Sequence, residues 1–141
     1  MSRQKPAGVF PLGIGTLSRR SGCNIETIRY YEKTGLLPTP ARSAGGHRLF
    51  GNVHLKRLTF ILRCRRLGFS PAEVRTLLDL ADAERPSCTE VQSVTEAHLY
   101  EVREKISDLR RLVRRLAQMV KACRTARAPD CPVLDELFES A

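Results

Sequence analysis

The sequence of 141 residues contains no tryptophan, and aromatic side chains make up only 6% of it. This composition suits packed aliphatic helices better than an all-β sandwich, whose strands favour aromatic residues. No apolar run approaches the roughly 18 residues that a membrane span needs, so we expect no contact with a membrane. The charged N-terminus is not followed by a long apolar stretch, which argues against a secretion signal and favours a cytoplasmic location.

The number and spacing of the cysteines argue against two classes of protein, those built on a disulfide framework and the thiol enzymes. There are five of them, an odd number, and without a secretion signal we expect no disulfide framework. The sequence lacks a C-x-x-C pair, and no cysteine has a histidine and a carboxylate at a spacing typical of catalysis. We therefore expect no enzyme activity, and the reduced thiols are left with packing, metal binding or redox chemistry.

Acidic residues are scarce in the first part of the chain. Residues 1–87 contain 15 Lys and Arg but only six Asp and Glu, and the net charge of the whole chain is +9. Such a surface suits a polyanion, because each Lys or Arg placed on a phosphate releases condensed counterions. A basic protein without a nucleic-acid partner is the alternative that charge alone leaves open.

The apolar spacing before residue 82 predicts four helices and a hairpin. Two short helices flank Gly22, and Asn24 is the expected N-cap of the second. Residues 41–51 have the pattern of a hairpin that turns at Gly45-Gly46. A third helix is expected with Asn52 as its N-cap. The sequence Ser70-Pro71-Ala72-Glu73 combines a capping box with a proline at the first helical position, which predicts a fourth helix. His47, His54 and His98 are expected at the surface or on the hairpin rather than as metal ligands.

The second part of the chain contains the longest periodic segment. Its apolar residues alternate steps of three and four without interruption, which is the pattern of a two-stranded coiled coil: Leu99, Val102, Ile106, Leu109, Val113, Leu116, Val120 and Cys123. Continued backwards, the pattern reaches Cys88. Too little chain remains to cover this seam, so we predict that a second copy covers it in a homodimer.

Charge favours antiparallel helices in this dimer. Residues 106–127 contain seven basic and one acidic residue, whereas residues 88–105 contain two basic and four acidic residues. A parallel pair would place the basic halves side by side, and each like-charge contact is unfavourable by a few tenths of a kcal/mol.

The antiparallel arrangement predicts a thiol site that is shared between subunits. Cys88 and Cys123 are 35 residues apart, which is about 50 Å along one helix, so they cannot meet within one chain. Cys88 of one subunit would approach Cys123 of the other, with Cys131 close to Cys123 in sequence. Converging thiolates favour a soft cation such as Hg²⁺, Cd²⁺ or Pb²⁺, whereas a closed zinc site would lack its fourth protein ligand.

A simpler interpretation of the thiols remains open, in which Cys88 and Cys123 are small apolar seam residues and Cys131 has no role. Cys23, in the turn between two helices, and Cys64, among apolar residues, are interpreted as packing residues.

Several motifs together resemble the MerR family of transcription regulators. They are Ile14-Gly15-Thr16-Leu17, Thr27-Ile28-Arg29-Tyr30-Tyr31-Glu32, Gly35-Leu36-Leu37-Pro38, Arg42, Arg48-Leu49-Phe50 and Leu67-Gly68-Phe69-Ser70. The resemblance covers about residues 12–138 and is most specific in the first 80. It implies a winged helix-turn-helix, an antiparallel coiled-coil dimer and an effector site at the ends of the coil.

The resemblance also implies how DNA is bound. Asn24–Lys33 would be the recognition helix in the major groove, with Thr27 and Tyr30 near base edges and Arg29 on a phosphate. Arg19 and Arg20 on the first helix, and Arg42 and Arg48 on the wing, would contact the DNA backbone. Two further candidates lie nearby, Asn24 at the N-cap of the recognition helix and His47 on the wing. Effector binding would distort a promoter whose −35 and −10 elements are too widely spaced, so that RNA polymerase can engage.

Within that family the chain resembles the heavy-metal sensors. Cys88, Cys123 and Cys131 match the three-cysteine pattern of mercury, lead and cadmium sensors. Copper, silver and gold sensors usually carry serine in place of Cys88, but the loop between Cys123 and Cys131 has the shorter, copper-type length. A monovalent ion held by Cys123 and Cys131 alone, a Zn²⁺ or Cu⁺ effector, and an organic effector therefore remain as alternatives, although an organic effector would normally need a larger domain.

The expected architecture is mainly α: a winged helix-turn-helix domain followed by a long antiparallel coiled-coil helix. The predicted segments are an N-terminal tail (1–11), the DNA-binding domain (12–82), the dimerisation helix (87–123), and a metal-binding loop with a short C-terminal helix (124–141).

Overall fold

The computed structural model describes residues 10–127 and 131–139 and divides into two compact units, Met1–Ser87 and Cys88–Ala141. The predicted mainly helical fold class is confirmed. The elements in chain order are α1 (Ile14–Ser21), α2 (Ile25–Lys33), β1 (Ala41–Arg42), β2 (Arg48–Leu49), α3 (Asn52–Arg66), α4 (Pro71–Asp82), α5 (Cys88–Thr125) and α6 (Pro132–Phe138). Among the described residues no helix is both long and apolar enough to span a membrane.

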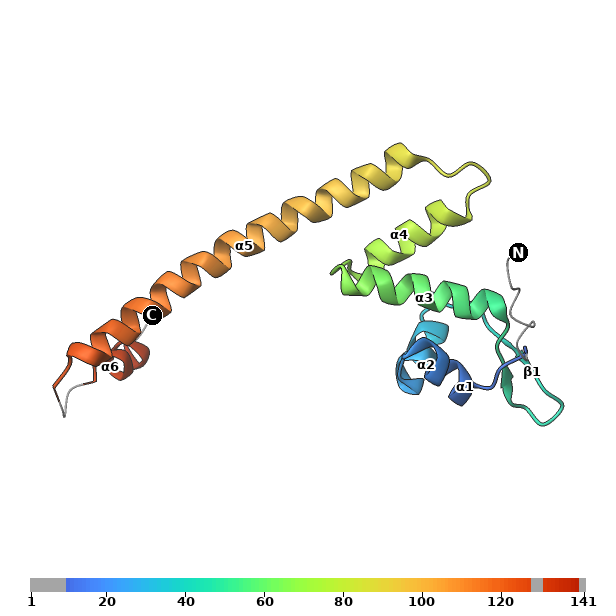
Figure 1. Cartoon of the computed structure of the whole chain (residues 1–141), viewed down its shortest axis with the longest axis horizontal. Coiled ribbons are helices and arrows are strands. Elements are labelled where there is room, and N and C mark those ends of the chain that lie inside the picture. Colours follow the sequence, from blue (N-terminus) through green and yellow to red (C-terminus); the bar gives the residue numbers. More distant parts are fainter. Residues whose placement is uncertain (1–9, 128–130, 140–141) are drawn as a thin grey trace, which may run out of the picture. The chain divides into compact units, whose positions relative to one another are not determined.

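Helices α1 and α2 form a helix-turn-helix (Figure 1). Gly22 ends α1 in the left-handed region, at φ 73°, where a side chain would be strained. Asn24 then caps α2 as predicted, because its side-chain oxygen accepts a hydrogen bond from the backbone N–H of Glu26. Leu17 and Ile28 are fully buried, so the two helices share one apolar core.

The predicted hairpin is a short wing. Strand β1 pairs antiparallel with β2, so that Ala41 lies opposite Leu49, and Gly46 makes the turn at φ 82°. Beyond the hairpin, the fully buried Phe50 forms an antiparallel bridge with Leu12, through hydrogen bonds of 2.7 and 2.8 Å. This bridge closes the base of the wing onto the segment that precedes α1.

Helices α3 and α4 supply a further part of the core of the first unit. Leu58, Ile61 and Val74 are fully buried. The capping box at Ser70 is present with both hydrogen bonds, 2.9 and 3.2 Å long, to and from Glu73. One predicted cap is wrong by a residue: Gly51 is the N-cap of α3, and Asn52 is already helical.

The expectation of a surface position is wrong for His54 and also for His98, which is 7% exposed. The side chain of His54 is 8% exposed, and both ring nitrogens have backbone partners. Nδ1 accepts from the N–H of Gly51 at 3.0 Å and completes the cap of α3, while Nε2 lies 3.2 Å from the carbonyl oxygen of Pro38. A histidine with both nitrogens satisfied is stable when buried.

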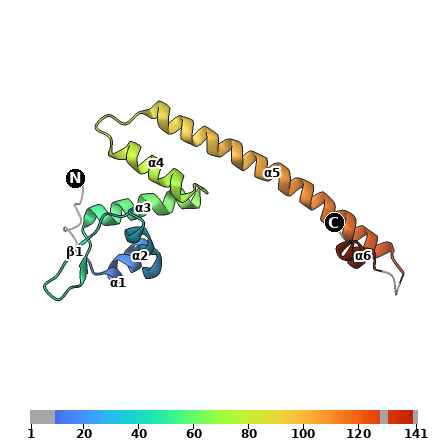
Figure 2. The same ribbon diagram turned by 180° about the vertical axis from the view of Figure 1, so that it is seen from behind.

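The second unit consists of α5 and α6. The 38 residues of α5 begin at Cys88 and continue to Thr125, two residues beyond Cys123. Helix α6 folds back against the last turns of α5, as both views show (Figure 2). The predicted coiled-coil seam is largely uncovered in the single chain, since Leu109, Val113 and Leu116 are 58%, 64% and 50% exposed.

Candidate nucleic-acid interface and thiol site

The exposed face of α2 carries the side chains that were predicted to reach DNA. Arg29 and Tyr30 are exposed, and 54% of the Tyr30 surface is accessible although it is aromatic. Thr27 is half-buried beside them. The side chain of Asn24 is already used in the cap of α2, so this residue orders the start of the helix.

Three of the predicted DNA-contacting residues meet at one notch of about 300 Å³. Arg29 of α2 lines this notch together with His47 and Arg48 of the wing. The rest of its lining is Gly46 in the turn of the wing and Gly13 and Ile14 at the start of α1. Two cationic side chains, an imidazole and the N-terminus of a helix converge here, which is an arrangement that favours an anion such as a DNA phosphate.

Two arginines of the wing also stabilise the wing itself. The guanidinium Nε of Arg48 lies 2.8 Å from a carboxylate oxygen of Glu32, and the two side chains are 28% and 14% exposed. This partly buried ion pair fixes β2 against α2. Arg42 donates to the carbonyl oxygen of Gly46 at 2.8 Å and so braces the turn of the wing.

The two arginines at the end of α1 are exposed. Arg19 donates to the hydroxyl of Thr16 at 3.1 Å. The guanidinium of Arg20 lies 5.3 Å from the centre of the Phe10 ring, which is a cation–π contact. The structure therefore places both charges on the outside of the helix-turn-helix, whereas the wing arginines are held by the ion pair and the hydrogen bond described above.

Cys23 and Cys64 are buried in the first unit, in agreement with their interpretation as packing residues. Burial raises the pKa of both thiols, because a thiolate would lose its hydration there. Both are therefore protonated at neutral pH and are poor metal ligands.

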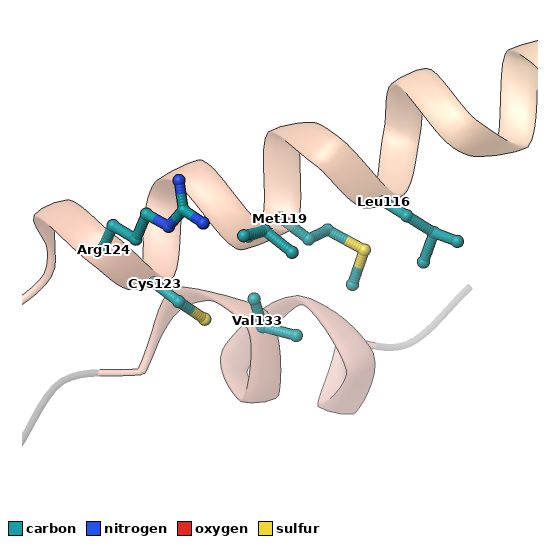
Figure 3. Close-up of a pocket in the computed structure, with 6 residues that line it drawn as sticks. Leu116, Met119, Cys123, Arg124 and Val133 are labelled. Atoms are coloured by element: carbon teal, nitrogen blue, oxygen red, sulfur yellow. The ribbon is translucent and has the colours of Figure 1, made fainter.

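Cys123 lines an apolar hollow of about 430 Å³ between α5 and α6. Its sulfur points toward the same space as Val133 of α6, and Met119 and Leu116 extend from the preceding turns of α5 (Figure 3). Cys123 itself is exposed. A thiol at the edge of an apolar hollow suits a soft, weakly hydrated ion better than a hard one.

Cys88 lines a second apolar hollow, of about 370 Å³, in the first turns of α5. Val91, Thr95 and Leu99 share its wall, and Cys88 is exposed. As predicted, one chain does not bring Cys88 and Cys123 together, because α5 is continuous between them and they are about 50 Å apart along it.

Cys131 is half-buried at the N-cap of α6. An ion pair between Arg115 of α5 and Glu136 of α6 holds this short helix in place. Residues 128–130 of the predicted metal-binding loop lie outside the described part of the chain. The chain therefore places Cys131 at the start of the helix that packs against the end of α5 that carries Cys123, and Cys88 at the opposite end of α5.

Sequence reasoning missed several residues that build the candidate nucleic-acid interface. Glu32 fixes the wing, and Arg57 and Arg75 bind backbone carbonyls that follow α2. Their partners are 16 to 41 residues away in sequence, and neither spacing nor composition signals such contacts.

Comparisons with known proteins agree with these features. A sequence profile described as "MerR HTH family regulatory protein" matches residues 12–81, and one described as "MerR, DNA binding" matches residues 55–119. The HTH-type transcriptional regulator ZntR homolog of Haemophilus influenzae is 41% identical, over 75% of this chain and 78% of its own. The mercuric resistance operon regulatory protein of Serratia marcescens is 39% identical, over 89% and 87%.

A solved structure is also similar, that of the transcription regulator PbrR691 from Ralstonia metallidurans CH34 in complex with lead(II). Its TM-score is 0.78 with 41% identity, and the match covers 89% of this chain and 98% of the other.

Proposed function

Because this chain belongs to the MerR family of helix-turn-helix regulatory proteins, we propose that it regulates transcription in response to a thiophilic metal ion. The effector is a soft divalent ion, Hg²⁺, Cd²⁺ or Pb²⁺. It is held by Cys88 of one subunit and by Cys123 and Cys131 of the other, in an antiparallel homodimer. The observation that carries the proposal is the position of exposed thiols in apolar hollows at both ends of one uncovered helix.

The DNA-binding step uses the first unit. Helix α2 inserts Thr27 and Tyr30 toward base edges, and the notch lined by Arg29, His47 and Arg48 takes a backbone phosphate. Two first units in one dimer bind two half-sites, and metal binding changes their geometry so that the promoter is distorted and RNA polymerase engages it.

The dimer is supported by the exposed seam of α5. Six seam residues from Leu99 to Val120 are 42–64% exposed, a larger apolar stripe than a helix normally leaves in water. In the antiparallel pairing the seam of one chain covers that of the other, and the basic half of α5 faces the acidic half of its partner. The hollow at Cys88 then faces the hollow at Cys123 at each end.

The donor set fits a soft ion. Three thiol ligands favour thiophilic metals, and the linings of the two hollows are mostly apolar and offer few of the oxygen ligands that a hard cation prefers. Two of the three proteins quoted above are described by mercuric resistance and by a complex with lead(II), which is consistent with this class of effector.

A mixed dimer tests the shared site. Cys88→Ser and Cys123→Ser homodimers each lack one ligand in both sites. Each is expected to bind Hg²⁺ at least about a hundredfold more weakly than the parent protein. Mixing the two variants places both substitutions in one site and leaves the other site intact. We expect the heterodimer, purified by two affinity tags, to bind one ion tightly, as read by thiolate-to-metal absorbance.

Two outcomes would contradict the shared site. A heterodimer without any tight site would mean that each site belongs to one chain. A Cys88→Ser homodimer with a full response to Cu⁺ or Ag⁺ would mean that Cys123 and Cys131 suffice and that the effector is monovalent.

A further inference from the structure

Arginines from α3 and α4 hold the junction between the recognition helix and the wing, residues 34–38. Arg75 of α4 donates a hydrogen bond to the carbonyl oxygen of Thr34, the C-cap residue of α2. Arg57 of α3 donates from Nε to the carbonyl oxygen of Leu36 at 3.3 Å. A cation at the end of a helix is favourable, and hydrogen bonds from charged donors are stronger than neutral ones.

His54 adds a third contact to the same junction, since its Nε2 lies 3.2 Å from the carbonyl oxygen of Pro38. The carbonyls of three alternate residues, 34, 36 and 38, are thus all bound by side chains of α3 and α4. The junction itself is closed by backbone bonds from Gly35 to Glu32 and from Leu37 to Tyr31, both 3.1 Å long. Its position is therefore set from outside, by α3 and α4.

Arg57 also reaches the end of α4. Its Nη1 lies 2.9 and 2.8 Å from the two carboxylate oxygens of Asp82, the last residue of α4. One guanidinium thus bridges the junction and the end of the helix that leads, through residues 83–87, to α5. The side chain of Arg57 is 23% exposed and that of Asp82 is 56% exposed, so only the arginine end of this link is partly shielded from water.

We propose that Arg57 and Arg75 are positioning residues for DNA recognition, which make the junction, and with it α2 and the wing, follow the position of α4. Through its ion pair with Arg57, Asp82 couples the junction to the C-terminal end of α4, which is the end that leads into the metal-binding unit. The Asp82 step rests on the proposed metal response, whereas the role of Arg75 is independent of it.

The substitution Arg75→Gln tests the junction without metal, with Arg66→Gln as a control at an exposed arginine of α3. On a duplex selected by the parent protein from random sequence, the Arg75 variant is expected to bind about tenfold more weakly, the effect of one lost charged hydrogen bond. Amide exchange of Gly35 and Leu37 in the free protein is expected to accelerate by about the same factor. The control should change neither.

The salt dependence separates positioning from direct contact. Loss of a phosphate contact would lower the slope of log affinity against log salt by about one, whereas a positioning residue leaves the slope near that of the parent. A slope reduced by one, or unchanged amide exchange, would overturn the assignment. Should Arg75→Gln fold poorly, Arg75→Lys keeps a donor and the charge, and is expected to show the same changes at a reduced size.

The substitution Asp82→Asn tests the link to α4, with Asp79→Asn as the control on the same helix. Metal-free DNA affinity is expected to stay within about twofold of the parent, since only one partly exposed ion pair is lost, while Hg²⁺-dependent promoter output falls severalfold. A full Hg²⁺ response in the Asp82 variant would overturn the link. If the parent responds to none of Hg²⁺, Cd²⁺ and Pb²⁺, the proposed function fails, whereas the role of Arg75 is still decided by amide exchange and by the salt dependence of DNA binding.

Discussion

At the scale of single residues, burial separates the five cysteines into two classes with different chemistry. Cys23 and Cys64 are 5% and 8% exposed, and burial raises their pKa. Cys88 and Cys123 are exposed, and Cys131 is half-buried. Two thiols therefore pack in the core, and the other three are accessible to a metal ion.

The two classes predict different reactivity. In the native protein at neutral pH, Cys23 and Cys64 are expected to react with iodoacetamide at least about tenfold more slowly than Cys88 and Cys123, because they are both covered and protonated. Mass spectrometry of tryptic peptides over time measures the rates. Equal rates at all five cysteines would contradict the packing role, and urea-unfolded protein provides the reference.

The same burial predicts a dependence of stability on alkaline pH. The folded-state pKa of Cys23 and Cys64 lies above the ordinary value of 9.0, so their contribution is complete below that value. It is lost as the pH rises toward the folded-state pKa, because the unfolded chain releases these protons first. Urea unfolding at pH 8 and pH 10 should show the loss, and Cys23→Ala should reduce it.

At the scale of elements, local capping and long-range hydrogen bonds have different effects on the position of a helix or strand. The start of α4 is fixed locally by Ser70, Pro71 and Glu73, and the start of α2 by Asn24. By contrast, the wing is attached to α2 by the ion pair of Arg48 with Glu32. Local caps determine where an element begins, and distant side chains determine how it is placed.

Removal of one cap tests the first of these statements. Ser70→Ala is expected to lower the free energy of unfolding by about 1 kcal/mol, because the N–H of Glu73 loses its acceptor. Chemical denaturation followed by circular dichroism measures the change. Ser70→Asp supplies another capping oxygen and should recover most of the loss; equal destabilisation by both substitutions would argue that the cap contributes little.

This difference between elements also explains what could be predicted from the sequence. The caps at Asn24 and Ser70, the glycine turns and the periodic seam are local patterns, and the structure contains them. The burial of His54 and the contacts of Arg57 and Arg75 depend on packing between distant segments, which leaves no periodic signal. For the site, spacing alone separated Cys88 from Cys123, but it did not reveal the apolar hollows beside them.

At the scale of the whole molecule, the exposed seam of α5 predicts that one chain is incomplete. Val113 lies at the middle of the seam and is 64% exposed. Val113→Glu would bury unpaired carboxylates between two helices, which is unfavourable by several kcal/mol. We expect the dimer to dissociate at least about a hundredfold more readily in analytical ultracentrifugation, with loss of tight DNA binding.

A charge on the outer face serves as the control for this prediction. Ser107→Glu adds the same carboxylate six residues earlier, off the seam, and should leave the dimer intact. If the Val113 variant sediments as the parent does, the seam is not the interface between subunits.

The unbroken length of α5 also fixes the distance between the two ends of the dimer. Cys88 and Cys123 are separated by 35 residues, a whole number of seven-residue periods, and no break in the helix lies between them. Inserting one further period would lengthen the rod by about 10 Å and leave both thiols on the same side. Inserting two residues would instead rotate one thiol by about 200° relative to the other and turn it away from the partner helix, so α5 should tolerate seven added residues better than two.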